Sequence, residues 1–130
     1  MSKILLIDDD VTFLRLIHEY VDERFPGLDI LTCNDPIKCL ANITADLDLL
    51  LVDLEMPGLD GSKILSYATA KGLSKNRVII LSARDADYLH ERFPLGSCLA
   101  VLNKHEIQQK AVLDMVFRSL QQKKTSGPAN

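Results

Sequence analysis

Residues 49–61 read Leu-Leu-Leu-Val-Asp-Leu-Glu-Met-Pro-Gly-Leu-Asp-Gly and carry the strongest signal for the fold. Four apolar residues are too few for a helix, and a continuous apolar run suits a strand that is buried on both faces. Pro57-Gly58 marks a turn, and Asp60-Gly61 is typical of a helix start. The stretch therefore predicts a buried strand that ends at Asp53, a turn, and a helix that runs to about residue 71.

The same alternation of short apolar runs and amphipathic stretches continues along the chain. Strands are expected at residues 4–7, 30–33, 49–52, 78–81 and 99–102. Helices are expected at residues 13–25, 36–44, 61–71, 85–93 and 107–120. Strands that alternate with helices predict an α/β fold with a parallel sheet and right-handed crossovers. With five strands, we expect a flavodoxin-like (βα)5 doubly wound sandwich with strand order 2-1-3-4-5.

Length and charge restrict the classes of function. The chain has 130 residues and a net charge of −3, so one domain is expected and broad attraction to nucleic acid is not. The start Met1-Ser2-Lys3 has no signal-peptide design, and no apolar run approaches membrane-spanning length. These features favour a cytoplasmic protein. We expect the domain at residues 1–122 and a tail or linker at residues 123–130, because the latter carry no periodicity.

The three cysteines are odd in number and have no C-x-x-C spacing. Cys33, Cys39 and Cys98 are therefore expected as buried small apolar residues in a reducing compartment, without a disulfide or a metal.

Polar residues follow four of the expected strands. Asp8 and Asp9 follow the first strand, Asp53 ends the third, Ser82 ends the fourth and Lys104 follows the fifth. In the expected strand order, these carboxyl ends are neighbours and form one pocket. Three carboxylates in one cleft repel one another unless a cation lies among them, and few, hard oxygen ligands favour Mg²⁺. A carboxylate beside Mg²⁺ can attack phosphorus, with the serine and the lysine neutralising the phosphoryl oxygens.

These residues resemble the response-regulator receiver family of two-component systems over about residues 3–122. The residues that carry the resemblance are Ile7-Asp8-Asp9, Val52 to Gly61, Leu81-Ser82-Ala83 and Asn103-Lys104.

The resemblance implies a role for each polar residue of the pocket. Asp8 and Asp9 match the metal-binding acidic pair, and Asp53 matches the phosphoacceptor, which also binds the metal. Ser82 matches the switch hydroxyl and Lys104 the phosphate-binding lysine. The backbone carbonyl of Glu55 is implied as a further metal ligand.

The resemblance also implies function and partners. A sensor histidine kinase or a histidine phosphotransfer protein would present a phosphohistidine, from which Asp53 takes the phosphoryl group. The domain would then act as a switch with self-phosphorylation and autodephosphorylation, not as a turnover enzyme. It would act on an output domain or effector protein that the sequence does not identify, and a second copy of the chain is a further candidate partner.

Two departures and two variable positions add hypotheses. Val101 stands where the family has an aromatic switch residue, so the output would need another reporter. His105 replaces a frequent proline. Glu55 and Arg84 each lie two residues after a site residue, Asp53 and Ser82 respectively. We expect the two to pair across the mouth of the site and to shield the acyl phosphate from water, with little effect on stability.

Two other classes of function stay open at this point. A pseudo-receiver would keep the fold as a binding module without the chemistry. A phosphatase of the haloacid-dehalogenase type would also use aspartate and Mg²⁺, but it places Asp-x-Asp after the first strand, and here the acids Asp8 and Asp9 are adjacent. Each polar residue alone also has a structural explanation as a helix cap, a turn residue or a solvated side chain.

Overall fold

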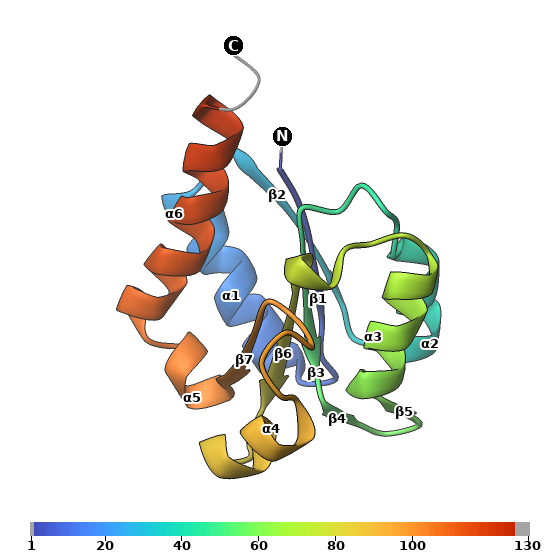
Figure 1. Cartoon of the computed structure of the whole chain (residues 1–130). Helices are drawn as coiled ribbons and strands as arrows, with labels where there is room; N and C mark the ends of the chain where they lie inside the picture. Colours follow the sequence, from blue (N-terminus) through green and yellow to red (C-terminus); the bar gives the residue numbers. More distant parts are fainter. Residues whose placement is uncertain (1, 127–130) are drawn as a thin grey trace.

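A five-stranded parallel sheet forms the centre of the molecule (Figure 1). The computed structural model describes residues 2–126, without the side chains of residue 86 and residues 122–126. The strands are β1 (Ser2–Ile7), β2 (Leu28–Cys33), β3 (Leu49–Asp53), β6 (Val78–Ser82) and β7 (Ala100–Asn103). Their order is β2-β1-β3-β6-β7 and every pair is parallel. The predicted 2-1-3-4-5 order is confirmed.

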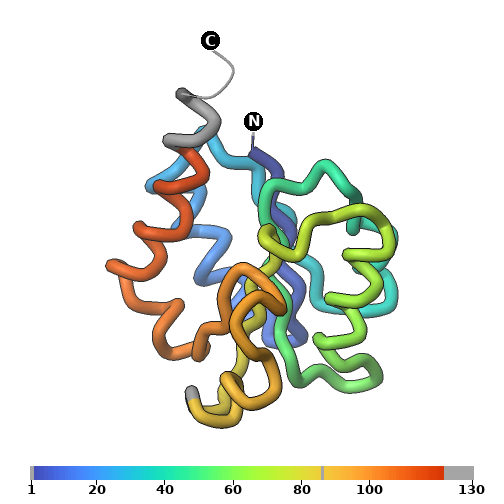
Figure 2. Tube along the Cα trace, in the orientation of Figure 1, coloured from blue at the N-terminus to red at the C-terminus, as the bar shows by residue number. Residues whose placement is uncertain are grey.

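Helices cover both faces of the sheet. They are α1 (Val11–Arg24), α2 (Pro36–Cys39), α3 (Gly61–Ala70), α4 (Ala86–Arg92), α5 (Lys104–Ile107) and α6 (Lys110–Ser126). Helices α1 and α6 lie side by side on one face, and α2 and α3 lie on the other (Figures 1 and 2). Among the described residues, no helix combines the length and the apolar character that crossing a membrane requires.

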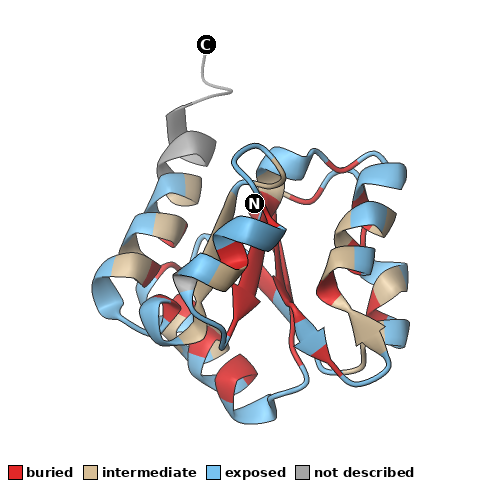
Figure 3. Ribbon diagram, turned by 60° about the horizontal axis from the view of Figure 1, so that its bottom comes forward, coloured by how far each residue is buried: buried red, intermediate tan, exposed pale blue. Residues whose placement is uncertain are grey.

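Two layers of core explain why the strands are apolar without alternation. On β1, Ile4 and Leu6 pack toward α1 and α6, whereas Leu5 and Ile7 pack toward the α2 and α3 side. Figure 3 shows that buried residues, in red, concentrate on the central strands. A strand that is covered on both faces buries every side chain, which is the pattern expected of a doubly wound sheet.

Aspartates cap the N-termini of four helices, among them α4, where Asp85 accepts a hydrogen bond from the N–H of Tyr88. Asp10 accepts hydrogen bonds from the backbone of the first turn of α1, Asp35 does so for α2, and Asp60 for α3. Pro36 occupies the first turn of α2, where its missing N–H costs no hydrogen bond.

Three segments differ from the expected elements. The helix predicted at residues 36–44 is divided into α2 and a 3-10 turn (Leu40–Asn42). The turn after β3 is a hairpin of two short antiparallel strands, β4 (Glu55–Met56) and β5 (Leu59–Asp60). Helix α6 continues to Ser126, into the segment expected as a tail, and residues 127–130 lie outside the described residues.

The expectation of three unpaired cysteines is wrong. Cys33 at the end of β2 and Cys39 at the end of α2 form a disulfide, with 5.9 Å between their Cα atoms. The turn between β2 and α2 brings the two sulfur atoms together, and no motif spacing in the sequence indicates this. Cys98 is free and half-buried, and burial raises the pKa of its thiol.

Candidate functional site

The polar residues predicted for the pocket come together at the carboxyl edge of the sheet. Asp53 and Ser82 end β3 and β6, Asp8 follows β1, and Lys104 follows β7. The strand register aligns these ends, because Ile7 pairs with Val52 and Ser82 pairs with Asn103. The side chains of three site residues are buried, namely Asp8, Asp53 and Ser82.

Lys104 lies against both buried carboxylates. Its Nζ atom is 2.7 Å from Asp8 Oδ2 and 3.4 Å from Asp53 Oδ2. The other oxygen of each carboxylate accepts a backbone hydrogen bond: Asp8 Oδ1 from the N–H of Asp10 at 2.9 Å, and Asp53 Oδ1 from the N–H of Glu55 at 3.4 Å. These contacts fix the orientation of both acids.

The carboxylates repel each other in spite of the lysine. Burial, as the larger cause, and the charge of Asp8, as the next, raise the pKa of Asp53 to about 7. Burial also raises the pKa of Asp8. Burial alone would lower the pKa of Lys104, but the hydrogen bond and charge of Asp8, with the charge of Asp53, raise it overall. The pocket therefore holds more negative charge than one ammonium group neutralises, which favours a bound cation.

The acids offer ligands for a metal ion. One carboxylate oxygen from each of Asp8, Asp9 and Asp53 lies within 4.8 Å of the others. Apart from the ion pair with Lys104, the buried Oδ2 atom of Asp8 has no hydrogen bond to a described residue. Asp9 is exposed, so its side of the cluster is open to water. Hard oxygen ligands with room for water fit Mg²⁺.

Gly61 packs directly against the backbone of Asp53. A Cβ atom at this position would lie 2.6 Å from the carbonyl oxygen of Asp53 and 2.8 Å from the Cα atom of Leu54. The N–H of Gly61 donates to the carbonyl of Leu54 at 2.9 Å. Only glycine leaves room for this approach of α3 to the end of β3.

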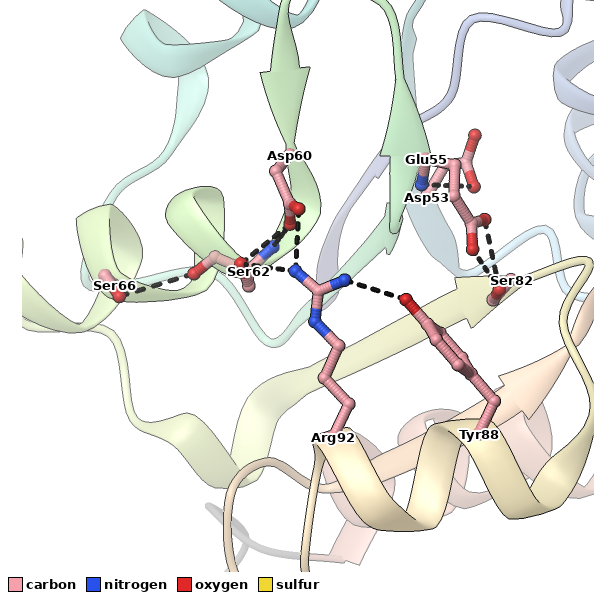
Figure 4. A network of polar contacts seen from close by, with 8 residues as sticks. All are labelled: Asp53, Glu55, Asp60, Ser62, Ser66, Ser82, Tyr88 and Arg92. Atoms are coloured by element: carbon pink, nitrogen blue, oxygen red, sulfur yellow. Dashed lines mark hydrogen bonds and ion pairs between the residues drawn. The ribbon is translucent and has the colours of Figure 1, made fainter.

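Ser82 reaches the pocket, but its hydroxyl is engaged with Glu55. The Oγ atom lies 2.7 Å and 3.0 Å from the two carboxylate oxygens of Glu55, and it accepts the N–H of Arg84 at 2.9 Å. Figure 4 shows Glu55 lying between Asp53 and Ser82. The sequence placed Ser82 correctly and did not indicate this partner.

The predicted ion pair between Glu55 and Arg84 is wrong for this structure. Among the described residues, Arg84 forms no ion pair with Glu55; its guanidinium lies 4.2 Å from the centre of the Tyr88 ring. Attraction between the cation and the ring draws Arg84 toward α4, and the hydroxyl of Ser82 takes its place beside Glu55.

Further contacts around the pocket were not predicted. Arg92 of α4 donates to the carboxylate of Asp60 at 2.7 Å and to the hydroxyl of Tyr88 at 3.0 Å (Figure 4). The side chain of Asn103 donates to the carbonyl of Arg84 at 3.1 Å. Asp60 and Asn103 were named from the sequence, as a helix start and as the residue before Lys104, but neither contact was predicted.

Comparisons with known proteins agree with this geometry. Residues 4–117 match the family described as response regulator receiver domain. The transcriptional regulatory protein CpxR of Klebsiella pneumoniae is 36% identical over 104 residues, which make up 72% of this chain and 44% of that protein. The chain thus matches less than half the length of this curated relative.

Solved structures show the same fold. The receiver domain of the Francisella response regulator 1452 is 25% identical with a TM-score of 0.73, over 92% of this chain and 99% of that one. The response regulator TrrA of Thermotoga maritima, in complex with Mg²⁺ and BeF, is 21% identical with a TM-score of 0.69, over 94% and 98%.

Proposed function

The chain belongs to the response-regulator receiver domain family, and we propose that Asp53 is its phosphoacceptor. In this reaction an Asp53 oxygen attacks the phosphorus of a phosphohistidine. The bond from phosphorus to the imidazole nitrogen breaks, and the imidazole leaves with the electron pair.

The observation that carries the proposal is the position of Asp53. Its buried carboxylate lies beside the metal-ligand candidate Asp8 at the carboxyl edge of the sheet, and the ammonium of Lys104 contacts both acids. The same ammonium would bind an oxygen of the incoming phosphoryl group. A preorganised cation of this kind stabilises the charge that develops during transfer.

Asp8, Asp9 and Asp53 would hold Mg²⁺, with the backbone carbonyl of Glu55 as a further ligand. The cluster of carboxylate oxygens and the crowded negative charge support this assignment. When bound, Mg²⁺ would compensate the charge of the acids and the phosphoryl oxygens. The TrrA structure contains Mg²⁺ with BeF, which is a precedent in a relative of similar fold.

The proposal includes the biological setting. A sensor histidine kinase or a histidine phosphotransfer protein in the cytoplasm would supply the phosphoryl group, and an output domain or effector protein would respond. The curated relatives include transcriptional regulators, which agrees with control of an output. The domain would act as a signalling switch that catalyses its own phosphorylation and dephosphorylation without substrate turnover.

Phosphorylation by a small-molecule donor tests the proposal. The protein is incubated with acetyl phosphate and Mg²⁺ and its intact mass is measured. We expect the mass of one phosphoryl group to be added to the wild type and to Asp29→Asn, an exposed aspartate of β2 that serves as the control. We expect no addition to Asp53→Asn.

Other outcomes favour the rival functions. A wild type that gains no mass, with or without Mg²⁺, contradicts the proposal and favours a pseudo-receiver. Multiple turnover of a small phosphate ester contradicts the description as a switch and favours a phosphatase.

A further inference from the structure

We infer that Glu55 is a positioning residue that holds the Ser82 hydroxyl away from the acceptor until the phosphoryl group arrives. The inference rests on the proposed function. It adds that the contact between Glu55 and Ser82 opposes phosphorylation in the resting protein. In this state, the hydroxyl proton that would donate to the phosphoryl group is committed to a carboxylate.

The hydrogen bonds around Ser82 determine where its proton points. A serine hydroxyl has one proton, and Ser82 Oγ accepts from the N–H of Arg84 at 2.9 Å. The acceptors within reach are the Glu55 oxygens at 2.7 Å and 3.0 Å. The proton is therefore directed to Glu55, and a hydrogen bond to a carboxylate is stronger than one between neutral groups.

Glu55 is placed so that a new negative charge can displace it. It is an exposed residue of the two-residue strand β4, whereas Ser82 is fully buried at the end of β6. A phosphoryl group on Asp53 would add charge of about −1.5 to −2 close to the Glu55 carboxylate. The like charges would repel, so the exposed side chain would move into water and the hydroxyl would become free to turn.

The cation that could have neutralised Glu55 is occupied elsewhere. The guanidinium of Arg84 lies over the ring of Tyr88, at 4.2 Å from its centre. Tyr88 in turn accepts from Arg92, which binds Asp60. Since Glu55 and Asp60 pair across the β4–β5 hairpin and Arg84 donates its N–H to Ser82, the contacts form a closed ring between the hairpin and α4. Breaking the Glu55–Ser82 contact opens this ring beside the acceptor.

Rates of phosphorylation by acetyl phosphate with saturating Mg²⁺ test the inference. We compare the wild type with Glu55→Ala and Glu55→Gln, and each with its counterpart that also carries Ser82→Ala. We expect Glu55→Ala to be phosphorylated about fivefold faster, the factor that corresponds to the loss of one hydrogen bond. Glu55→Gln should lie near the wild type, because its amide oxygen still accepts the hydroxyl proton.

The variants that also carry Ser82→Ala distinguish an effect of Glu55 on the hydroxyl from an effect of its charge alone. With Ser82→Ala present, the three side chains at position 55 should give equal rates. Glu91→Ala removes an exposed glutamate of α4 and should react like the wild type. A gain that persists without the hydroxyl, with Glu55→Gln as fast as Glu55→Ala, marks simple charge repulsion and overturns the inference.

The inference and the proposed function fail in different ways. A wild type that is phosphorylated at the same rate as Glu55→Ala overturns the inference alone. A wild type that gains no phosphoryl group overturns the proposed function, and the inference with it.

Discussion

The two walls of the pocket differ in how firmly the fold holds them. The acidic wall (Asp8, Asp53 and Lys104) is tied together by ion pairs of 2.7 Å and 3.4 Å and by backbone hydrogen bonds to both acids. The hydroxyl wall (Glu55, Ser82 and Arg84) depends on one exposed carboxylate and on a guanidinium that has turned toward α4. The difference teaches that the groups proposed for the chemistry are preorganised, whereas the group proposed for switching is not.

The largest expected effect comes from removing the cation of the acidic wall. Lys104→Ala should slow phosphorylation by acetyl phosphate by about 100-fold, because the proposed reaction would lose a preorganised charge beside the phosphoryl oxygens. Intact mass against time measures the rate. Lys110→Ala, an exposed lysine at the start of α6, is the control. A decrease in the phosphorylation rate of less than threefold would mean that the reaction does not depend on the charge of Lys104.

Gly61→Ala tests how rigidly the acceptor strand is supported. The added Cβ atom would lie 2.6 Å from the Asp53 carbonyl oxygen, so α3 or β3 must shift. We expect the free energy of unfolding in urea to fall by about 3 kcal/mol. Gly27→Ala, where the nearest atom would be 3.7 Å away, should change it by less than about 1 kcal/mol. Equal effects at the two positions would contradict a tightly supported acceptor.

The acidic wall should also make stability depend on pH. The pKa of Asp53 is raised from 3.8 to about 7, so the folded state binds its proton more tightly than the unfolded state does. The protonation of Asp53 therefore contributes to the free energy of unfolding. This stabilisation is fully present below pH 3.8 and is lost as the pH rises through about 7. In EDTA, we expect Asp53→Asn to be more stable than the wild type at pH 8, by on the order of 2 kcal/mol.

Unfolding in urea from pH 5 to pH 8 measures that difference. The advantage of Asp53→Asn should shrink toward pH 5, and added Mg²⁺ should reduce it at pH 8 by stabilising the wild type. A difference that is independent of both pH and Mg²⁺ would show that the ionised carboxylate of Asp53 does not destabilise the folded state.

The smallest effect is expected at the edge of the hydroxyl wall. Arg92→Ala removes an ion pair to Asp60 whose side chains are 35% and 37% exposed. We expect the unfolding free energy to fall by about 0.5 kcal/mol, since exposed ion pairs contribute little. Arg15→Ala, an exposed arginine of α1, is the control. A decrease in the unfolding free energy of more than about 2 kcal/mol would mean that the fold holds the hydroxyl wall firmly, which contradicts the comparison of the two walls.

Much of the fold and the acidic wall could be predicted because their signals are local. Apolar runs without alternation indicated strands buried on both faces, and Asp60-Gly61 marked a helix start. Residues at the ends of parallel strands meet because the strand order makes those ends neighbours. This reasoning needed no knowledge of side-chain conformations, so it placed Asp53 and Lys104 together.

The rest depended on side-chain directions that sequence patterns do not contain. Ser82 and Glu55 are 27 positions apart, and their contact depends on which way an exposed glutamate turns. Arg84 had two attractive partners, a carboxylate and an aromatic ring, and charge pairing alone predicted the wrong one. The roles of the site residues remain predictions that the proposed phosphorylation experiments test.

The Cys33–Cys39 disulfide has a consequence for anyone who handles the protein. Cys33 and Asp9 line one cleft beside the acids, and the carbonyl of Cys33 accepts the N–H of Asp8 at 3.2 Å. Samples prepared with and without a reductant are therefore expected to be two covalent species that differ by two hydrogen atoms next to the proposed phosphorylation site. Rates and stabilities can be compared between laboratories only when the thiol content of each sample is stated.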